Sequence, residues 1–143
     1  MKKTVWFDMD GTIADLYAVD NWLEMLRNYD PTPYAIAKPL VNMSRLARKL
    51  HKMQAEGWNI GIISWSSKVS TPEYDEAVAQ AKASWLKKHL PSVSWDEIYV
   101  VAYGTPKSNF IKTNLDILFD DEEKNRNEWT GQSFEPSMIF TQI

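Results

Sequence analysis

Short apolar runs alternate with segments of helical periodicity along most of this chain. The runs are rich in β-branched and aromatic residues, as buried strands are. Strands that alternate with helices form a mostly parallel sheet covered on both faces. We therefore expect an α/β fold, a three-layer Rossmann-like domain with a mostly parallel five-stranded sheet. The predicted strands are residues 4–8, 58–63, 98–102, 115–119 and 137–140.

The segments between these strands carry helix start and stop signals. Apolar residues at helical spacing predict a first helix from Ala14 to about Tyr29, where an Asp-Pro-Thr-Pro stretch ends it. Residues 30–39 contain three prolines and no clear period, so we interpret about 29–42 as a loop or a much reduced insertion. Further helices are predicted around 46–53 with Gly57 as a cap, from 71 to before 91, from 105, and from 122 to 129.

Size and charge limit the classes of function. A chain of 143 residues is enough for one domain with a single core, and we take 1–143 as that domain. The net charge of −3 argues against a surface built for nucleic acid, although a small phosphorylated substrate needs only a local positive site. The absence of cysteine excludes disulfides, a thiol nucleophile and thiolate metal sites.

The amino-terminal residues do not form a targeting segment. They begin with two lysines, but Asp8 interrupts the apolar run that follows, so they do not resemble a signal peptide. No apolar stretch of the chain is long enough to span a bilayer. We therefore expect a cytoplasmic protein with no membrane partner.

Two acids end the first predicted strand. Asp8 and Asp10 are two residues apart, so their side chains project to the same side and crowd together. Such a pair is stable only when a cation or a shared proton relieves the repulsion, and Mg²⁺ prefers oxygen ligands of this kind. By itself, an Asp-x-Asp-Gly segment equally fits a polar turn, because Asp and Gly are common turn residues.

Three more strand ends carry polar groups. Ser64 opens a Ser-Trp-Ser-Ser loop that can offer a hydroxyl and backbone N–H groups to a phosphate, although a serine-rich turn is the commoner reading. Lys107 lies in the first turn of a predicted helix, where a bound phosphate would relieve its repulsion by the helix dipole; a solvated lysine fits equally well. Asp120 follows an apolar strand, so its carboxylate needs a partner, and a metal shared with Asp8 is one.

Taken in order, these segments resemble the haloacid-dehalogenase (HAD) superfamily. Phe7–Thr12, with the sequence FDMDGT, resembles the first signature of that family, and Ile60–Ser64 is similar to the second. Lys107 matches the lysine of the third, and Leu118–Asp121 matches the acidic fourth. Since the four segments extend from residue 7 to residue 121, the resemblance covers nearly the whole chain and implies a HAD-like fold.

The resemblance also implies a role for each matching residue. Asp8 would attack phosphorus and form an aspartyl-phosphate, and Asp10 would act as general acid and then as general base. Ser64 and Lys107, with the loop at Trp65, would bind the phosphoryl oxygens; Lys68 and Lys112 are weaker candidates for the lysine role. The Mg²⁺ ligands would be Asp8, the backbone carbonyl of Asp10, and Asp120, with Asp121 as an orienting or water-mediated ligand.

The chain departs from larger members of the family because it has no domain-sized cap. An open site suits a bulky substrate or one enclosed by a neighbouring subunit of a homo-oligomer. The sequence DMDGTIAD at residues 8–15 is also similar to the opening of the 5′(3′)-deoxyribonucleotidases, which favours a nucleoside monophosphate over other small phosphomonoesters. Aromatic residues that could stack on a base, although each more often packs in a core, are Tyr17, Tyr34, Trp65 and Tyr103.

The leading hypothesis is thus a Mg²⁺-dependent phosphomonoester hydrolase acting on a small phosphorylated substrate. One alternative is a phosphatase of nucleic-acid ends, which an open site would admit and the acidic net charge disfavours. Another is a phosphate-binding HAD-like protein without turnover. A receiver domain of the response-regulator type fits poorly, because its accepting Asp ends the third strand, and here that strand ends in Ala102 and Tyr103.

Overall fold

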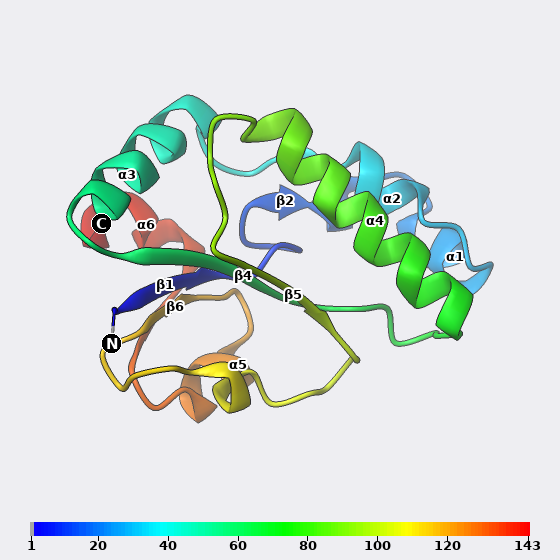
Figure 1. Ribbon diagram of the computed structural model, residues 1–143. Coiled ribbons are helices and arrows are strands. Elements are labelled where there is room, and N and C mark those ends of the chain that lie inside the picture. The colour runs from blue at the N-terminus through cyan, green and yellow to red at the C-terminus, as the bar shows by residue number, and fades with distance from the viewer. Residues whose placement is uncertain (1) are drawn as a thin grey trace.

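A five-stranded parallel sheet between two layers of helices forms the centre of the computed structural model, which describes residues 2–143 (Figure 1). All of its strand pairs are parallel, and the predicted three-layer fold is confirmed. The order across the sheet is β5-β4-β1-β6-β7, with β5 Glu97–Val101, β4 Asn59–Trp65, β1 Thr4–Phe7, β6 Ile117–Phe119 and β7 Gln132–Phe134.

The central strand β1 is buried on both faces. Val5 and Phe7 belong to the larger core cluster, and Trp6 belongs to a separate cluster with Leu118 and Trp129. Because β1 pairs with both β4 and β6, Phe7 is in register with Ile62 on one side and with Phe119 on the other. The residues that follow β1, β4 and β6 therefore lie together at one edge of the sheet.

Helices cover both faces of the sheet. Helices α3 (Met43–Ala55), α4 (Pro72–His89) and α6 (Ile139–Gln142) lie on one face in Figure 1, and α5 (Glu123–Glu128) lies on the other, together with the 3-10 helix η2 (Lys107–Phe110). The predicted cap at Gly57 and the predicted helix start at Thr71 are both present. Gly57 follows α3 with a positive φ of 96°, and the Thr71 side chain accepts a hydrogen bond from the Tyr74 N–H at the start of α4.

The prediction of one helix over residues 14–29 is wrong. That segment consists of a two-residue strand, β2 (Ala14–Asp15), a 3-10 turn, η1 (Leu16–Ala18), and a short helix, α1 (Trp22–Arg27). Asn21 adopts the left-handed conformation with φ 60°, which interrupts a right-handed helix. The apolar spacing was real, but it belongs to separate elements that bury Leu16 and Leu26 and leave Leu23 exposed.

The interpretation of residues 30–39 as a loop is also wrong in part. Helix α2 (Thr32–Ile36) forms there, followed by β3 (Lys38–Pro39), which pairs antiparallel with β2. The prolines permit this helix because Pro31 precedes it and Pro33 lies in its first turn, where no backbone N–H is needed. The Asp30 carboxylate fixes the helix start by accepting from the Thr32 N–H.

The last predicted strand is misplaced. Residues 137–140 form the end of a 3-10 helix, η3 (Pro136–Met138), and the start of α6, whereas the fifth strand is β7. Ile139 is completely buried in the main core, which explains the apolar pattern. Strand β7 was not predicted because it is a short, polar edge strand. None of the helices formed by residues 2–143 has the length and apolar character needed to cross a membrane.

Candidate active site

Asp8, the first residue after β1, lies at the centre of the polar cluster at the sheet edge. Its backbone N–H still donates to the Phe119 carbonyl (2.9 Å), so the strand pairing fixes its position. Its Oδ2 accepts from the Thr12 hydroxyl (3.0 Å). The turn between these two residues requires Gly11, which has φ +81° and whose Cβ would collide with the Asp121 carboxylate.

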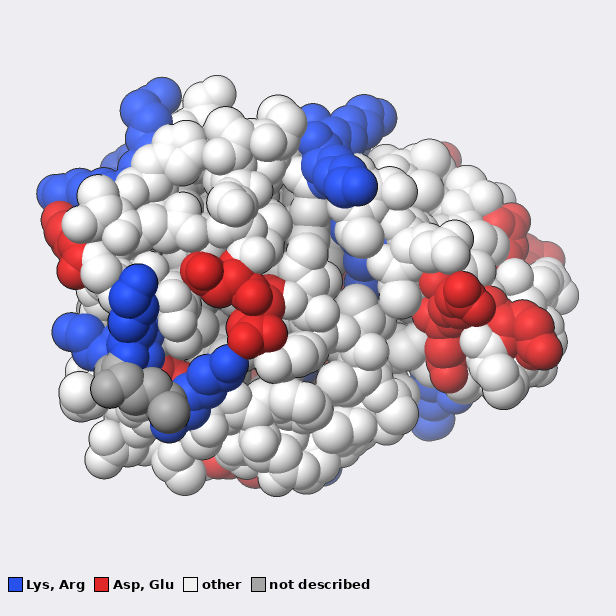
Figure 2. All heavy atoms as spheres, in the orientation of Figure 1, with Lys and Arg blue, Asp and Glu red and all other residues white. Residues whose placement is uncertain are grey.

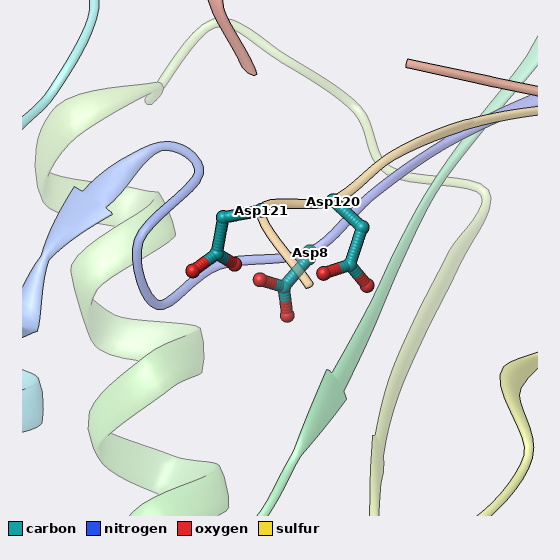
Figure 3. Close-up of side chains that lie close together, drawn as sticks. All are labelled: Asp8, Asp120 and Asp121. Carbon is teal, nitrogen blue, oxygen red and sulfur yellow. The ribbon is translucent and has the colours of Figure 1, made fainter. Parts of the chain in front are cut away.

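Asp120 and Asp121 meet Asp8 from the end of β6. Figure 3 shows the Asp8 carboxylate between those of the other two, and one oxygen from each of the three lies within 4.8 Å of the others. Burial, together with the charge of Asp8, raises the pKa of Asp120 to about 6 and that of Asp121 to about 8. The three acids therefore repel one another when all are ionised.

Lys107 supplies positive charge to this cluster. Its buried Nζ lies 2.8 Å from Asp8 Oδ1 and 2.7 Å from Asp120 Oδ2. Burial alone would lower the pKa of Lys107, but the two carboxylates outweigh it and hold the pKa above its usual value. Asn125 Nδ2 also donates to Asp120 Oδ2 (3.1 Å), and its own buried Oδ1 has no hydrogen-bond partner among residues 2–143.

A second group forms around Asp10 on the α4 side. Lys82, on α4, donates from Nζ to Asp10 Oδ2 (2.9 Å), Ser64 Oγ (2.6 Å) and the Trp65 carbonyl (2.7 Å). Burial raises the pKa of Asp10 although Lys82 opposes the shift. Sequence reasoning missed Lys82. Its position could have indicated a special role, because Lys82 shares the buried stripe of α4 with Tyr74, Val78 and Leu86. A charged residue is unexpected on the apolar face of a helix.

A pocket of about 580 Å³ opens above these carboxylates. One wall is the segment 16–36, which packs through Leu16, Leu26 and Tyr34 against Tyr74 and Val78 of α4. Segment 16–36, which we call the cap segment, thus forms one wall of the pocket. The aromatic residues that line the pocket are Tyr17, Trp22, Tyr34, Trp65 and Tyr103.

The structure brings most of the predicted site residues to this pocket. Asp8, Asp10, Trp65, Lys107 and Asp121 line it. The indole N–H of Trp65 donates to the Thr105 carbonyl (2.8 Å). Asp120 and Ser64 are completely buried behind the lining residues. Of the alternative lysines, Lys68 borders the pocket and Lys112 pairs with Glu97.

The charges of the cluster fit a divalent cation. Four carboxylates (Asp8, Asp10, Asp120 and Asp121) face two ammonium groups (Lys82 and Lys107), which leaves an excess of two negative charges when all are ionised. The donors available are oxygens, the ligands that Mg²⁺ prefers. A divalent cation would offset both the burial and the repulsion by Asp8 that raise the pKa values of Asp120 and Asp121.

Two solved structures share this architecture. The first is D,D-heptose 1,7-bisphosphate phosphatase from Burkholderia thailandensis, with a TM-score of 0.54, 13% identity, and coverage of 88% of this chain and 70% of that one. The second is a chain of a Pnkp1/Rnl/Hen1 complex, with a TM-score of 0.56 and 20% identity; 94% of this chain matches 46% of that one, less than half its length. The fold is HAD-like. No protein-family model and no curated protein sequence matches the chain.

The repulsion at Asp121 predicts a stabilising substitution in metal-free protein. The pKa of Asp121 is about 8 in the folded protein, so folding opposes the ionisation of this carboxyl. The free energy of unfolding therefore falls as the pH rises from about 4 through about 8. Asp121→Asn should therefore raise the melting temperature at pH 8.5 and have little effect near pH 4. Because solvent screens the partly exposed carboxylate, we expect about 1 kcal/mol, or about 2–4 °C.

The measurement is thermal unfolding in EDTA at both pH values, with Asp20→Asn as a control that removes an exposed acid that does not line the pocket. Added Mg²⁺ should raise the melting temperature of the wild type more than that of Asp121→Asn, because binding to the native state is stabilising. A lower melting temperature for Asp121→Asn at pH 8.5 would show that the carboxylate contributes favourable contacts instead.

Proposed function

We propose that this protein is a Mg²⁺-dependent phosphomonoester hydrolase that works through an aspartyl-phosphate on Asp8. The observation that carries the proposal is the position of the Asp8 carboxylate. It lies at the pocket, between Lys107 Nζ (2.8 Å) and the Thr12 hydroxyl (3.0 Å), with Asp10 two residues further on. A fixed carboxylate nucleophile beside a cation and a second acid is the arrangement that two-step phosphoryl transfer needs.

In this proposal each side chain has one chemical task. An Asp8 oxygen attacks phosphorus, the P–O bond to the alcohol breaks, and Asp10 gives the departing oxygen a proton. The raised pKa of Asp10, caused by burial, favours the protonated form that this step uses. Asp10 then takes a proton from a water molecule that attacks phosphorus and releases Asp8. Lys107 and the end of β4 at Ser64 and Trp65 contact the phosphoryl oxygens.

The proposed Mg²⁺ ligands are Asp8, the backbone carbonyl of Asp10, and Asp120, with Asp121 in an orienting role. The bound ion would supply positive charge against the phosphoryl oxygens. Asp120 is suited to this because its other contacts hold it still: its Oδ1 accepts from the Glu122 N–H (2.9 Å) and its Oδ2 from Lys107 and Asn125.

The substrate class proposed is a nucleoside monophosphate. Five aromatic side chains line the pocket, and Trp65 and Tyr103 lie against each other with ring centroids 5.0 Å apart. Flat aromatic walls suit a planar base, because stacking contributes about 1–3 kcal/mol per base. On the face drawn in Figure 2, basic and acidic groups of the described residues alternate, which suits a small substrate better than a long nucleic-acid strand.

A panel of phosphomonoesters tests the proposal. Phosphate release should require Mg²⁺ and stop in EDTA, and kcat/KM should be about 10- to 100-fold higher for a nucleoside 5′-monophosphate than for ribose 5-phosphate, which lacks the base. A 5′-phosphorylated oligonucleotide and a sugar bisphosphate complete the panel. Failure to release phosphate from any compound would sink the proposal, and a clear preference for the oligonucleotide would favour the phosphatase of nucleic-acid ends.

A further inference from the structure

The buried ammonium group of Lys82 is bound on every side. The side chain is 1% exposed, and its three hydrogen bonds reach Asp10, Ser64 and the Trp65 carbonyl at 2.6–2.9 Å. These acceptors use all three protons of an ammonium group. The ring of Tyr34, from α2 in the cap segment 16–36, faces the same Nζ at 4.9 Å from its centroid. Lys82 thus joins the Asp10 loop, the end of β4 and the cap at a single atom.

Stability does not explain a lysine at this place. The neighbouring inward positions of α4, Val78 and Leu86, are apolar and buried. Burying a charge is costly, and replacing a buried ion pair with apolar residues of similar volume is often neutral or stabilising. Lys82 is 1% exposed and is not among the residues that line the pocket. What it does contact is Asp10, which lines the pocket.

We propose that Lys82 is a positioning residue that holds the Asp10 carboxylate in the orientation required for proton transfer. This inference rests on the function proposed above. Lys82 binds Asp10 Oδ2 and so leaves Oδ1 as the oxygen that exchanges a proton with the leaving group and with water. The contact to Trp65 O fixes Asp10 relative to β4, the strand whose end borders the pocket. The hydrogen bond to Ser64 Oγ leaves the Ser64 proton free to be donated elsewhere.

A leaving-group comparison separates this role from a purely structural one. A nucleoside 5′-monophosphate releases an alkoxide that needs a proton, whereas p-nitrophenyl phosphate releases a stable phenolate that does not. For a two-step reaction, kcat/KM reports the steps up to release of the alcohol. Lys82→Met should therefore lower kcat/KM by about 10- to 100-fold for the nucleotide and by less than about 3-fold for p-nitrophenyl phosphate.

Asp10→Asn provides the second test. If Lys82 acts through Asp10, then Lys82→Met added to Asp10→Asn should change kcat/KM for the nucleotide by less than about 3-fold, because coupled residues are not additive. Lys87→Met is the matched control, since it removes an exposed lysine from the same helix. Lys82→Gln, which keeps a donor of similar length without the charge, replaces Lys82→Met if the latter unfolds at assay temperature.

The outcomes are distinct. Equal losses on both substrates, or a full additional loss in the Asp10→Asn background, would overturn the role of Lys82 while leaving an active phosphatase. Wild-type protein that releases no phosphate from either substrate would overturn the proposed function and this inference with it. Selective loss on the nucleotide, in a variant that is still folded at assay temperature, would support the inference.

Discussion

Asp8→Asn is expected to reduce phosphate release by a factor on the order of 10⁴ or more while the fold stays intact. The amide oxygen of Asn is uncharged and cannot form the acyl phosphate, so the first chemical step has no nucleophile. The substitution keeps the shape of the side chain, including an oxygen able to accept from Lys107 Nζ. It also removes one of three mutually repelling acids, so the melting temperature of metal-free protein should stay level or rise.

Two measurements check this. Initial rates with Mg²⁺ should fall for both a nucleoside 5′-monophosphate and p-nitrophenyl phosphate, because loss of the nucleophile does not depend on the leaving group. Mass spectrometry of acid-quenched wild-type protein should find a phosphoryl adduct on the peptide that contains Asp8, and Asp8→Asn should lack it. Asp20→Asn, a change of the same kind at an exposed position, should behave as wild type. Near-normal rates for Asp8→Asn would eliminate the aspartyl-phosphate.

The parts of the fold that could be predicted depend on local pattern. Buried strands of a parallel sheet appear as short apolar runs, and β1, β4, β5 and β6 all lie within or close to such runs. Parallel strands bring their carboxyl ends to one edge, so Asp8 and Asp120 could be placed together without knowing a single contact. The position of Lys107 before β6 fitted a solvated lysine equally well, and only the resemblance to the third HAD segment selected it; its distances to both acids agree with that choice.

The parts that could not be predicted depend on tertiary contacts. Segment 16–36 consists of pieces too short to be stable alone, and their register is set by packing on α4. Lys82 is another such case, because its three acceptors come from residues 10, 64 and 65, far away in the sequence. A lysine within a helical pattern is predicted to be exposed, because lysine is rarely buried. Its burial can be recognised only when the packing of the helix is known.

Lys107→Met should be the most destabilising substitution in the site. It leaves Asp8 and Asp120 buried next to each other without the cation that both contact at 2.7–2.8 Å. Removing one partner of a buried ion pair costs about 3–5 kcal/mol, which corresponds to roughly 6–20 °C in melting temperature for a domain of this size. Phosphate release should fall as well, by about 10²- to 10³-fold, because a group that faces the phosphoryl charge is lost.

The pH dependence identifies the cause of this destabilisation. Asp120 already has a raised pKa of about 6 with Lys107 in place, and loss of the cation should raise it further. The deficit of the variant should thus be largest above pH 7 and shrink as the pH falls toward about 4, where the Asp120 carboxyl binds a proton in the folded as well as in the unfolded state. Added Mg²⁺ should restore part of the stability, since a divalent cation can replace the lost positive charge.

Lys112→Met is the matched control for Lys107→Met. The Lys112–Glu97 pair is just as short (2.6 Å), but its side chains are 34% and 30% exposed, so its loss should cost no more than about 1 kcal/mol. Comparable melting temperatures for the two variants would mean that the buried acids at Asp8 and Asp120 do not depend on Lys107 for charge balance.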